Sequence, residues 1–245
     1  MRTFVRTLCV GVALTLVAML PTVARATALV SPGNSISGTY FGTGNPNSGW
    51  AVDSENGVEI GLAANLRFIG PITPSGSTYT APTGTSAGDA LWDFLFSVDI
   101  CPNCTTSPPP VLTGYTADLK LQDVGLGTIT STANNVLLIP DNNCVGGSPA
   151  TVVGSPHAGS CDLTKDWAAQ NAENLSFTGV ASLLGDPNFN PNLADTYIFT
   201  LTLSSPAGSQ LAQTSITVNT VPEPSSLALL ACGLLGFYGV RRRKA

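Results

Sequence analysis

Apolar and polar residues alternate along several segments of this 245-residue chain, and this period of two restricts the fold more than any other feature. In residues 58–68 every second side chain is apolar, namely Val58, Ile60, Leu62, Ala64, Leu66 and Phe68. Glu59, Asn65 and Arg67 lie between them, so we expect a strand with one face in a core and the other in water.

Two further segments repeat the pattern. The apolar sets are Trp92, Phe94, Phe96, Val98 and Ile100 in residues 92–100, and Tyr115, Ala117, Leu119 and Leu121 in residues 115–122. We expect the intervening residues, among them Asp93, Ser97 and Asp99, to face water. Other strands are expected at 36–41, 136–139, 175–183, 196–203 and 210–219, with a short helix at 164–173 and a long loop at 142–160.

The composition agrees with a chain of short strands. Only 10% of the residues are charged, and 25 glycines and 18 prolines are a high content of turn formers, which excludes a coiled coil and argues against a helical bundle. We therefore predict an all-β fold, an antiparallel β-sandwich of the Ig-like or jelly-roll type, formed by one domain at residues 27–220.

The charges are distributed unevenly. Residues 27–220 hold three basic residues, Arg67, Lys120 and Lys165, against fourteen acidic ones, a net charge of −11. This acidic surface argues against binding to nucleic acid or to an anionic membrane surface.

The N-terminus has the three parts of a secretory signal peptide. Arg2 and Arg6 precede an apolar run from Leu8 to Leu20, and overlapping A-x-A sites follow. We place the cleavage after Ala26, which makes residues 1–26 the signal peptide, with Ala28 as the alternative.

The C-terminus reads as a membrane segment. Residues 225–240 are sixteen residues without a charge, about 24 Å long as a helix at ~1.5 Å per residue, and a basic tail follows: Arg241, Arg242, Arg243 and Lys244. The positive-inside rule places that tail in the cytoplasm, so residues 27–220 are expected outside it, on a membrane-anchored precursor.

The motif Val221-Pro222-Glu223-Pro224 directly precedes this segment. Together, residues 221–245 resemble the PEP-CTERM sorting signal of Gram-negative bacteria that make exopolysaccharide. The resemblance implies a partner, an exosortase, which is an integral-membrane transpeptidase that recognises Pro-Glu-Pro and removes the tail. A final location at the cell surface or in the matrix would follow, whereas a linker before a permanent anchor is the alternative.

Four cysteines lie in the exported part: Cys101, Cys104, Cys144 and Cys161. They allow three pairings in an oxidising compartment, of which we favour Cys101–Cys104 and Cys144–Cys161. Redox chemistry at Cys101–Cys104 is disfavoured because a run of prolines follows where a helix N-terminus would be needed, and the spacing of the second pair disfavours zinc.

No motif of a catalytic site is present. His157, the only histidine, lies in a Gly/Ser/Pro-rich stretch without a nucleophile motif. Asp89, Asp93 and Asp99 could suit a glycosidase pair, but alternation explains Asp93 and Asp99 more simply as the wet face. We expect no enzymatic activity and no required cofactor.

Oxygen side chains recur at every second position in one segment, which resembles the start of a calcium loop: Asp186, Asn188, Asn190 and Asn192, with Asp195 after them. Pro191 stands where an EF-hand needs glycine, and Asx-Pro turns between strands are the alternative.

Trp50 lies in a turn-rich stretch and is a candidate for stacking on a sugar, although plugging the end of a sandwich is the simpler role. The sequence thus predicts an exported surface or matrix protein associated with exopolysaccharide and biofilm. The alternative is a carbohydrate-binding module for the cell's own exopolysaccharide, assisted by calcium.

Overall fold

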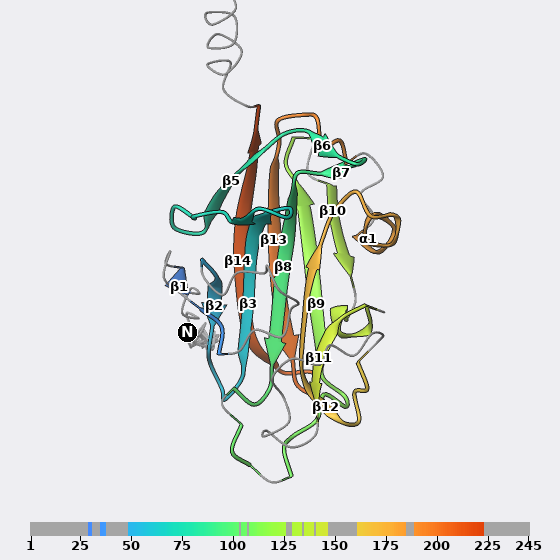
Figure 1. Ribbon diagram of the computed structural model, residues 1–245. Helices are drawn as coiled ribbons and strands as arrows, with labels where there is room; N and C mark the ends of the chain where they lie inside the picture. The colour runs from blue at the N-terminus through green and yellow to red at the C-terminus, as the bar shows by residue number, and fades with distance from the viewer. Residues whose placement is uncertain are drawn as a thin grey trace, which may run out of the picture.

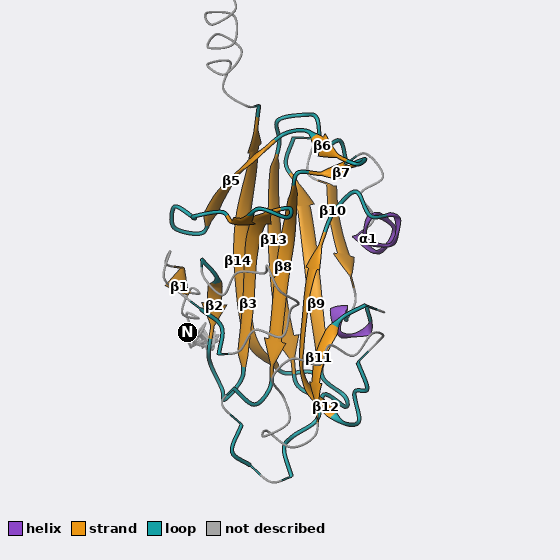
Figure 2. Ribbon diagram, in the orientation of Figure 1, coloured by secondary structure: helices purple, strands orange, loops and turns teal. Residues whose placement is uncertain are grey.

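The computed structural model describes residues 29–30, 35–37, 49–102, 104–106, 108–125, 129–133, 135–139, 141–146, 161–184 and 189–222. Most of these residues form strands, and two sheets lie face to face (Figures 1 and 2). The predicted all-β class is confirmed. The expected signal peptide (1–26) and membrane segment (225–240) lie outside the described residues.

The first sheet has seven strands among the described residues, in the order β1-β2-β3-β8-β12-β11, with β4 paired to the end of β3. Their bounds are β1 Leu29–Val30, β2 Ala51–Asp53, β3 Glu59–Leu66, β4 Gly70–Pro71, β8 Trp92–Asp99, β11 Asn143–Gly146 and β12 Asp166–Glu173. All neighbours are antiparallel, and the long central pair β3–β8 places Glu59 opposite Asp99 and Leu66 opposite Trp92.

The second sheet has the order β10-β9-β13-β14-β5, and a separate hairpin is formed by β6 and β7. The bounds are β5 Thr78–Pro82, β6 Thr85–Ser86, β7 Asp89–Ala90, β9 Thr116–Asp123, β10 Ile129–Ala133, β13 Thr196–Ser204 and β14 Gln210–Val221. β14 and β5 are parallel, with Thr217 opposite Thr78, so the expected purely antiparallel arrangement is wrong at this pair. The chain crosses from β4 in the first sheet to the edge of the second, and this crossover allows β5 to run in the direction of β14.

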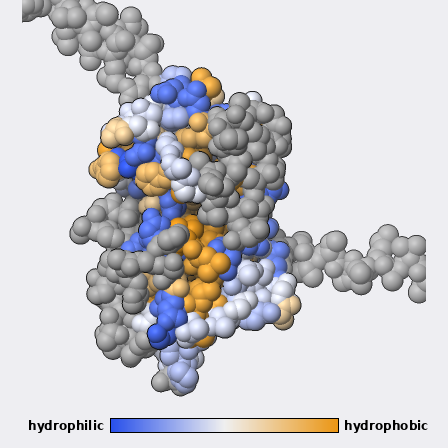
Figure 3. Space-filling model, turned by 90° about the vertical axis from the view of Figure 1, so that its right-hand side faces the viewer, coloured by the Kyte–Doolittle hydropathy of each residue, from blue (hydrophilic) through white to orange (hydrophobic). Residues whose placement is uncertain are grey.

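The core lies between the two sheets and is built mostly from the apolar faces that the alternation predicts. The prediction is wrong for Phe68, which is 87% exposed because β3 ends at Leu66 and Phe68 lies in the turn that follows. Across the core, β14 and β13 of the second sheet pack against β3 of the first. Aromatic rings fill its centre. The ring centroids of Phe94 and Phe199 lie 4.7 Å apart in a stacked pair, and those of Trp92 and Tyr197 lie 5.6 Å apart. Burying one such side chain contributes about 2–3 kcal/mol. On the side where β10, β11 and α1 lie, Figure 3 shows hydrophobic residues gathered in a strip along the middle of the molecule.

The polar face of the first sheet is not in water, which corrects the prediction for β3 and β8. Glu59, Asn65, Asp93 and Asp99 are all less than 9% exposed. Ile36 and Trp50 pack on this outer face against Ala63 and Leu95 and form a second, smaller apolar cluster. The three buried carboxylates are hydrogen-bonded; for example, the Glu59 carboxylate accepts the Ser37 backbone N–H at 2.7 Å. The side-chain oxygen of Asn65 is buried without a hydrogen-bond partner among the described residues.

Four local predictions are wrong. In the segment 164–173, expected to be a helix, residues 166–173 form strand β12, because pairing with β8 and β11 overrides the helix propensity of its alanines. Residues 136–139 form a 3₁₀-helix (Val136–Leu138), which begins after Asn135 at a φ of 60°. Residues 175–183 contain helix α1 (Thr178–Leu184), and β11 occupies the start of the expected 142–160 loop.

The remaining strand predictions have mixed outcomes. β13 and β14 confirm the strands expected at 196–203 and 210–219. Of the strand expected at 36–41, only residues 36 and 37 are described, and neither lies in a strand.

Candidate functional site

The sorting motif begins where the sheet ends. β14 is hydrogen-bonded through its last residue, because the Thr83 backbone N–H donates to the Val221 carbonyl at 2.9 Å. Thr220 is held on its other side by Asp195, whose backbone N–H donates to the Thr220 hydroxyl at 2.8 Å. Val221 and Pro222 are exposed, and Glu223, Pro224 and the basic tail (Arg241, Arg242, Arg243 and Lys244) lie outside the described residues. The two described motif residues, Val221 and Pro222, therefore lie at the end of a strand that is hydrogen-bonded up to Val221.

The four cysteines form the two favoured disulfides, Cys101–Cys104 and Cys144–Cys161. The sulfurs of the second pair lie close to the Asp166 carboxylate, in a group that resembles a metal site by distance. Because both sulfurs are used in the disulfide, no thiolate is left there to bind zinc.

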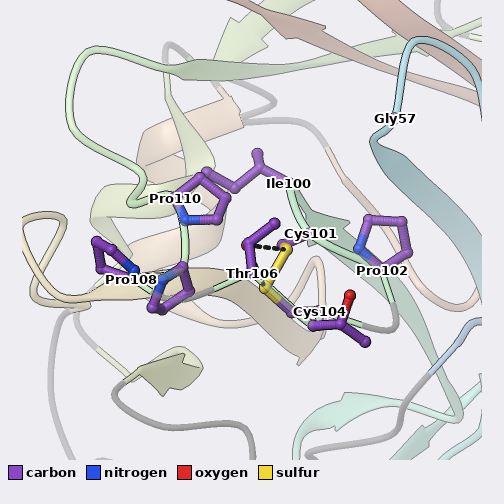
Figure 4. Close-up of a pocket in the computed structure, with 10 residues that line it drawn as sticks. Gly57, Ile100, Cys101, Pro102, Cys104, Thr106, Pro108 and Pro110 are labelled. Carbon is purple, nitrogen blue, oxygen red and sulfur yellow. Dashed lines mark hydrogen bonds between the residues drawn. A yellow bond between two sulfur atoms is a disulfide. The ribbon is translucent and has the colours of Figure 1, made fainter.

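A shallow cavity of about 590 Å³ opens over the first disulfide. Figure 4 shows this disulfide between Pro102 and the run Pro108–Pro110, with the Thr106 hydroxyl 3.4 Å from the Cys104 sulfur. The lining contains no charged side chain, and prolines lack the N–H groups that would bind an anion. The described lining of this cavity therefore offers no group for acid–base chemistry. The disulfide follows strand β8 and does not stand at a helix N-terminus, which would lower the thiol pKa of a redox cysteine.

Of the three carboxylates considered for a glycosidase pair, Asp89 and Asp93 belong to an ion-pair cluster, whereas Asp99 accepts the Cys101 backbone N–H at 2.8 Å. The Arg67 guanidinium contacts Asp89 at 2.9 Å and Asp93 at 3.4 Å, and its carbon lies 4.9 Å from the centre of the Phe177 ring. Asn174 donates to Asp93 at 2.8 Å. Burial raises the pKa of Asp93, while Asn174 and Arg67 act in the opposite direction. Since the Arg67 guanidinium pairs with both Asp89 and Asp93, we interpret this cluster as a structural contact.

Glu173 is a buried carboxyl that the sequence analysis missed, because its strand was expected to be a helix. It is 2% exposed, and burial, with smaller contributions from Asp141 and Asp93, raises its pKa to about 8. Asn171 donates to Glu173 at 2.7 Å and to Asp141 at 3.2 Å. At neutral pH this side chain is therefore mostly a neutral acid inside the protein.

The calcium candidates are only partly described. Asp186 and Asn188 lie outside the described residues, as does His157. Of the others, Asn190 accepts the Asn192 backbone N–H at 3.0 Å, and Asp195 accepts the Gly125 backbone N–H at 2.8 Å. The first contact is that of an Asx turn, whereas the second joins segments far apart in the sequence, and calcium binding stays a prediction.

Trp50 is fully buried, which excludes the candidate role of stacking on a sugar. Its ring packs on the outer face of the first sheet with Ile36 and Leu95. Trp92 is a core residue, as predicted, and Trp167 is buried as well.

Within the part of the chain that the structure describes, no helix is long and apolar enough to cross a membrane. A search of curated proteins finds none that matches this chain. Residues 220–244 match the family described as the PEP-CTERM protein-sorting motif. The C-terminal end of this chain thus carries the PEP-CTERM sorting motif, which indicates an exported protein that an exosortase sorts from a membrane-anchored precursor.

Proposed function

We propose that the β-domain is a non-enzymatic component of the cell surface or extracellular matrix, associated with exopolysaccharide and biofilm, and set free from its membrane tail by an exosortase. The observation that carries this proposal is the position of the motif, directly after the last hydrogen-bonded residue of β14. Cleavage after Val221 or Pro222 would remove no strand, so the released domain would keep its whole hydrogen-bonded sheet.

The contacts that two of its carboxylates make within the fold support the proposal that this domain is not an enzyme. Asp93 is paired with Arg67 and bonded to Asn174, and one oxygen of Asp99 accepts the Cys101 backbone N–H at 2.8 Å. Groups occupied in this way are poor candidates for proton transfer to a substrate.

We also propose that the two facing sheets be classified as a β-sandwich, with the Ig-like and jelly-roll types both open. The shared core between the sheets supports this proposal.

Sorting is tested by the intact mass of the protein recovered separately from envelope and medium, for the natural chain and for Glu223→Ala. We expect the natural chain to yield a species that ends near Pro222–Pro224. Glu223→Ala should keep the tail and stay in the envelope, because the carboxylate between the two prolines is the motif's only charged group.

Glu55→Ala is the matched control, since Glu55 lies in the β2–β3 turn, away from the motif. It should be processed like the natural chain. Equal processing of the Glu223 variant, or a natural protein that always keeps residues 225–245, would contradict the proposal and favour a permanent anchor.

Binding to the cell's own exopolysaccharide, assisted by calcium, is the alternative role of the domain. The net charge of −11 over residues 27–220 supports a need for divalent ions near an anionic polymer. Affinity electrophoresis of the secreted protein in that polysaccharide, with calcium or a chelator, tests it, and unchanged mobility in both would exclude it.

A further inference from the structure

The exposed large apolar side chains of the described residues are not spread evenly over the surface. They are Phe68 (87% exposed), Ile69 (80%), Leu138 (56%), Leu193 (53%), Val124 (41%) and Val221 (41%). All except Leu138 lie at the end of the molecule from which the C-terminal tail departs. We call these five residues, Phe68, Ile69, Val124, Leu193 and Val221, the apolar end.

Strand directions place three of these residues, Val124, Leu193 and Val221, at one end. β9 and β14 finish there and β13 begins there, because the Val124 backbone N–H donates to the Thr196 carbonyl at 2.9 Å. The Thr220 hydroxyl donates to the Leu193 carbonyl at 3.1 Å, directly before Val221. In Figure 1 the tip of β14, close to the last described residue, Pro222, lies at the top of the molecule.

The turn that carries Phe68 and Ile69 is joined to this end through a chain of backbone hydrogen bonds. Arg67 donates to Leu91 at 2.9 Å, Leu91 donates to Gly84 at 3.2 Å, and Thr83, next to Gly84, donates to Val221 at 2.9 Å. β3 runs in the same direction as β14, because Gln213 donates to Asp53, the partner of Ile60, and Thr214 donates to Ala51, the partner of Leu62.

Phe68 is held outward by its backbone. Its φ is 61°, in the left-handed region that a bulky side chain rarely adopts, and its ring lies over the Arg67 guanidinium at 4.7 Å. Apart from this contact with Arg67, the described packing of the domain gives no reason for a strained, almost fully exposed phenylalanine followed by an exposed isoleucine.

We propose that the apolar end lies against the lipid bilayer in the precursor, with Phe68 and Ile69 in the interfacial region. This inference rests on the proposed function, because it needs the tail to be a membrane segment. Only three residues lie between Val221 and the start of the uncharged segment at Ser225, and these four steps along the chain span at most about 14 Å when extended. A bilayer that holds residues 225–240 is thus within reach of this end of the domain.

The contact is apolar and not electrostatic. None of the five residues is basic, and Arg67 beside them is paired with Asp89 and Asp93. Phenylalanine and isoleucine enter the interface of zwitterionic lipid as well as that of anionic lipid. Contact should therefore need no anionic headgroup.

The test uses the full chain in phosphatidylcholine vesicles, with a photoreactive benzoylphenylalanine in place of Phe68 or, as the matched control, Leu138. Leu138 is also exposed and apolar but lies in the 3₁₀-helix away from the tail. After illumination we expect about tenfold more lipid adduct at position 68 than at 138 by mass spectrometry. Adding phosphatidylglycerol should leave this ratio unchanged.

Equal adduct at the two positions, adducts mainly to a second copy of the chain, or a need for phosphatidylglycerol would each overturn the inference. Extraction with alkaline carbonate separates its failure from that of the proposed function. If the chain stays in the vesicles without lipid adducts at 68, only the bilayer contact is refuted. If carbonate extracts the chain, the tail is no membrane segment, and both proposals fail.

Discussion

At the residue scale, burial changes the chemistry of one acidic side chain. Glu173 lies on strand β12 at 2% exposure and accepts a hydrogen bond from Asn171, while Asp141 and Asp93 add negative charge nearby. Its pKa of about 8 in the folded protein is well above the ordinary 4.5. The folded state therefore binds a proton that the unfolded state has lost between these two pH values.

This difference predicts how stability depends on pH. The free energy of unfolding should fall as the pH rises from 4.5 to about 8, since ionising Glu173 in the folded protein is unfavourable, and then level off. Glu173→Gln keeps the oxygen that accepts from Asn171 but cannot ionise. Its free energy of unfolding relative to the natural protein should therefore rise across this window by about 5 kcal/mol. Urea unfolding of both proteins at several pH values measures it, and parallel curves would contradict the pKa.

At the element scale, two disulfides close loops of different length. Cys144 in β11 pairs with Cys161 over a sequence separation of 17, whereas Cys101 and Cys104 are separated by 3. In the chain-entropy account a longer loop loses more freedom in the unfolded state, so the Cys144–Cys161 disulfide contributes more to stability.

Replacing both cysteines of a pair by alanine tests this difference. We expect a loss of about 3 kcal/mol in the free energy of unfolding for Cys144→Ala with Cys161→Ala, and about 2 kcal/mol for Cys101→Ala with Cys104→Ala. Each pair serves as the control of the other. A larger loss for the short loop would mean that the Cys101–Cys104 disulfide stabilises the native strand end directly.

At the scale of the whole molecule, the domain and its sorting tail are separated at Val221. Strand β14 lies between β13 and β5, and its last five residues, 217–221, pair with β5 while 217–219 also pair with β13. The sheet needs these residues, whereas Pro222 follows the last paired position.

Two truncations measure this boundary. A chain that ends at Pro222 should unfold with the same free energy as the full chain to within about 0.5 kcal/mol. A chain that ends at Ile216 loses the buried Val218 and the whole pairing with β5, so it should be unfolded or lose several kcal/mol. Equal stability of the two truncated proteins would show that β5 is not held by β14.

Sequence patterns predicted what depends on neighbours along the chain. The alternation in 115–122 matches the inner and outer faces of β9, because its outer face remains partly or fully exposed. The favoured pairing of the four cysteines also agrees with the structure, and the sorting motif was recognisable from contiguous residues.

Only the tertiary structure decided what depends on residues far apart in the sequence. Asp93 and Asp99 have the same alternating pattern as β9 but are buried, because segments distant in the sequence cover the outer face of the first sheet. Residues 166–173 have a helix-forming composition but become a strand between β8 and β11. Burial and strand pairing are set by the partner that packs against a segment, and local periodicity contains no information about that partner.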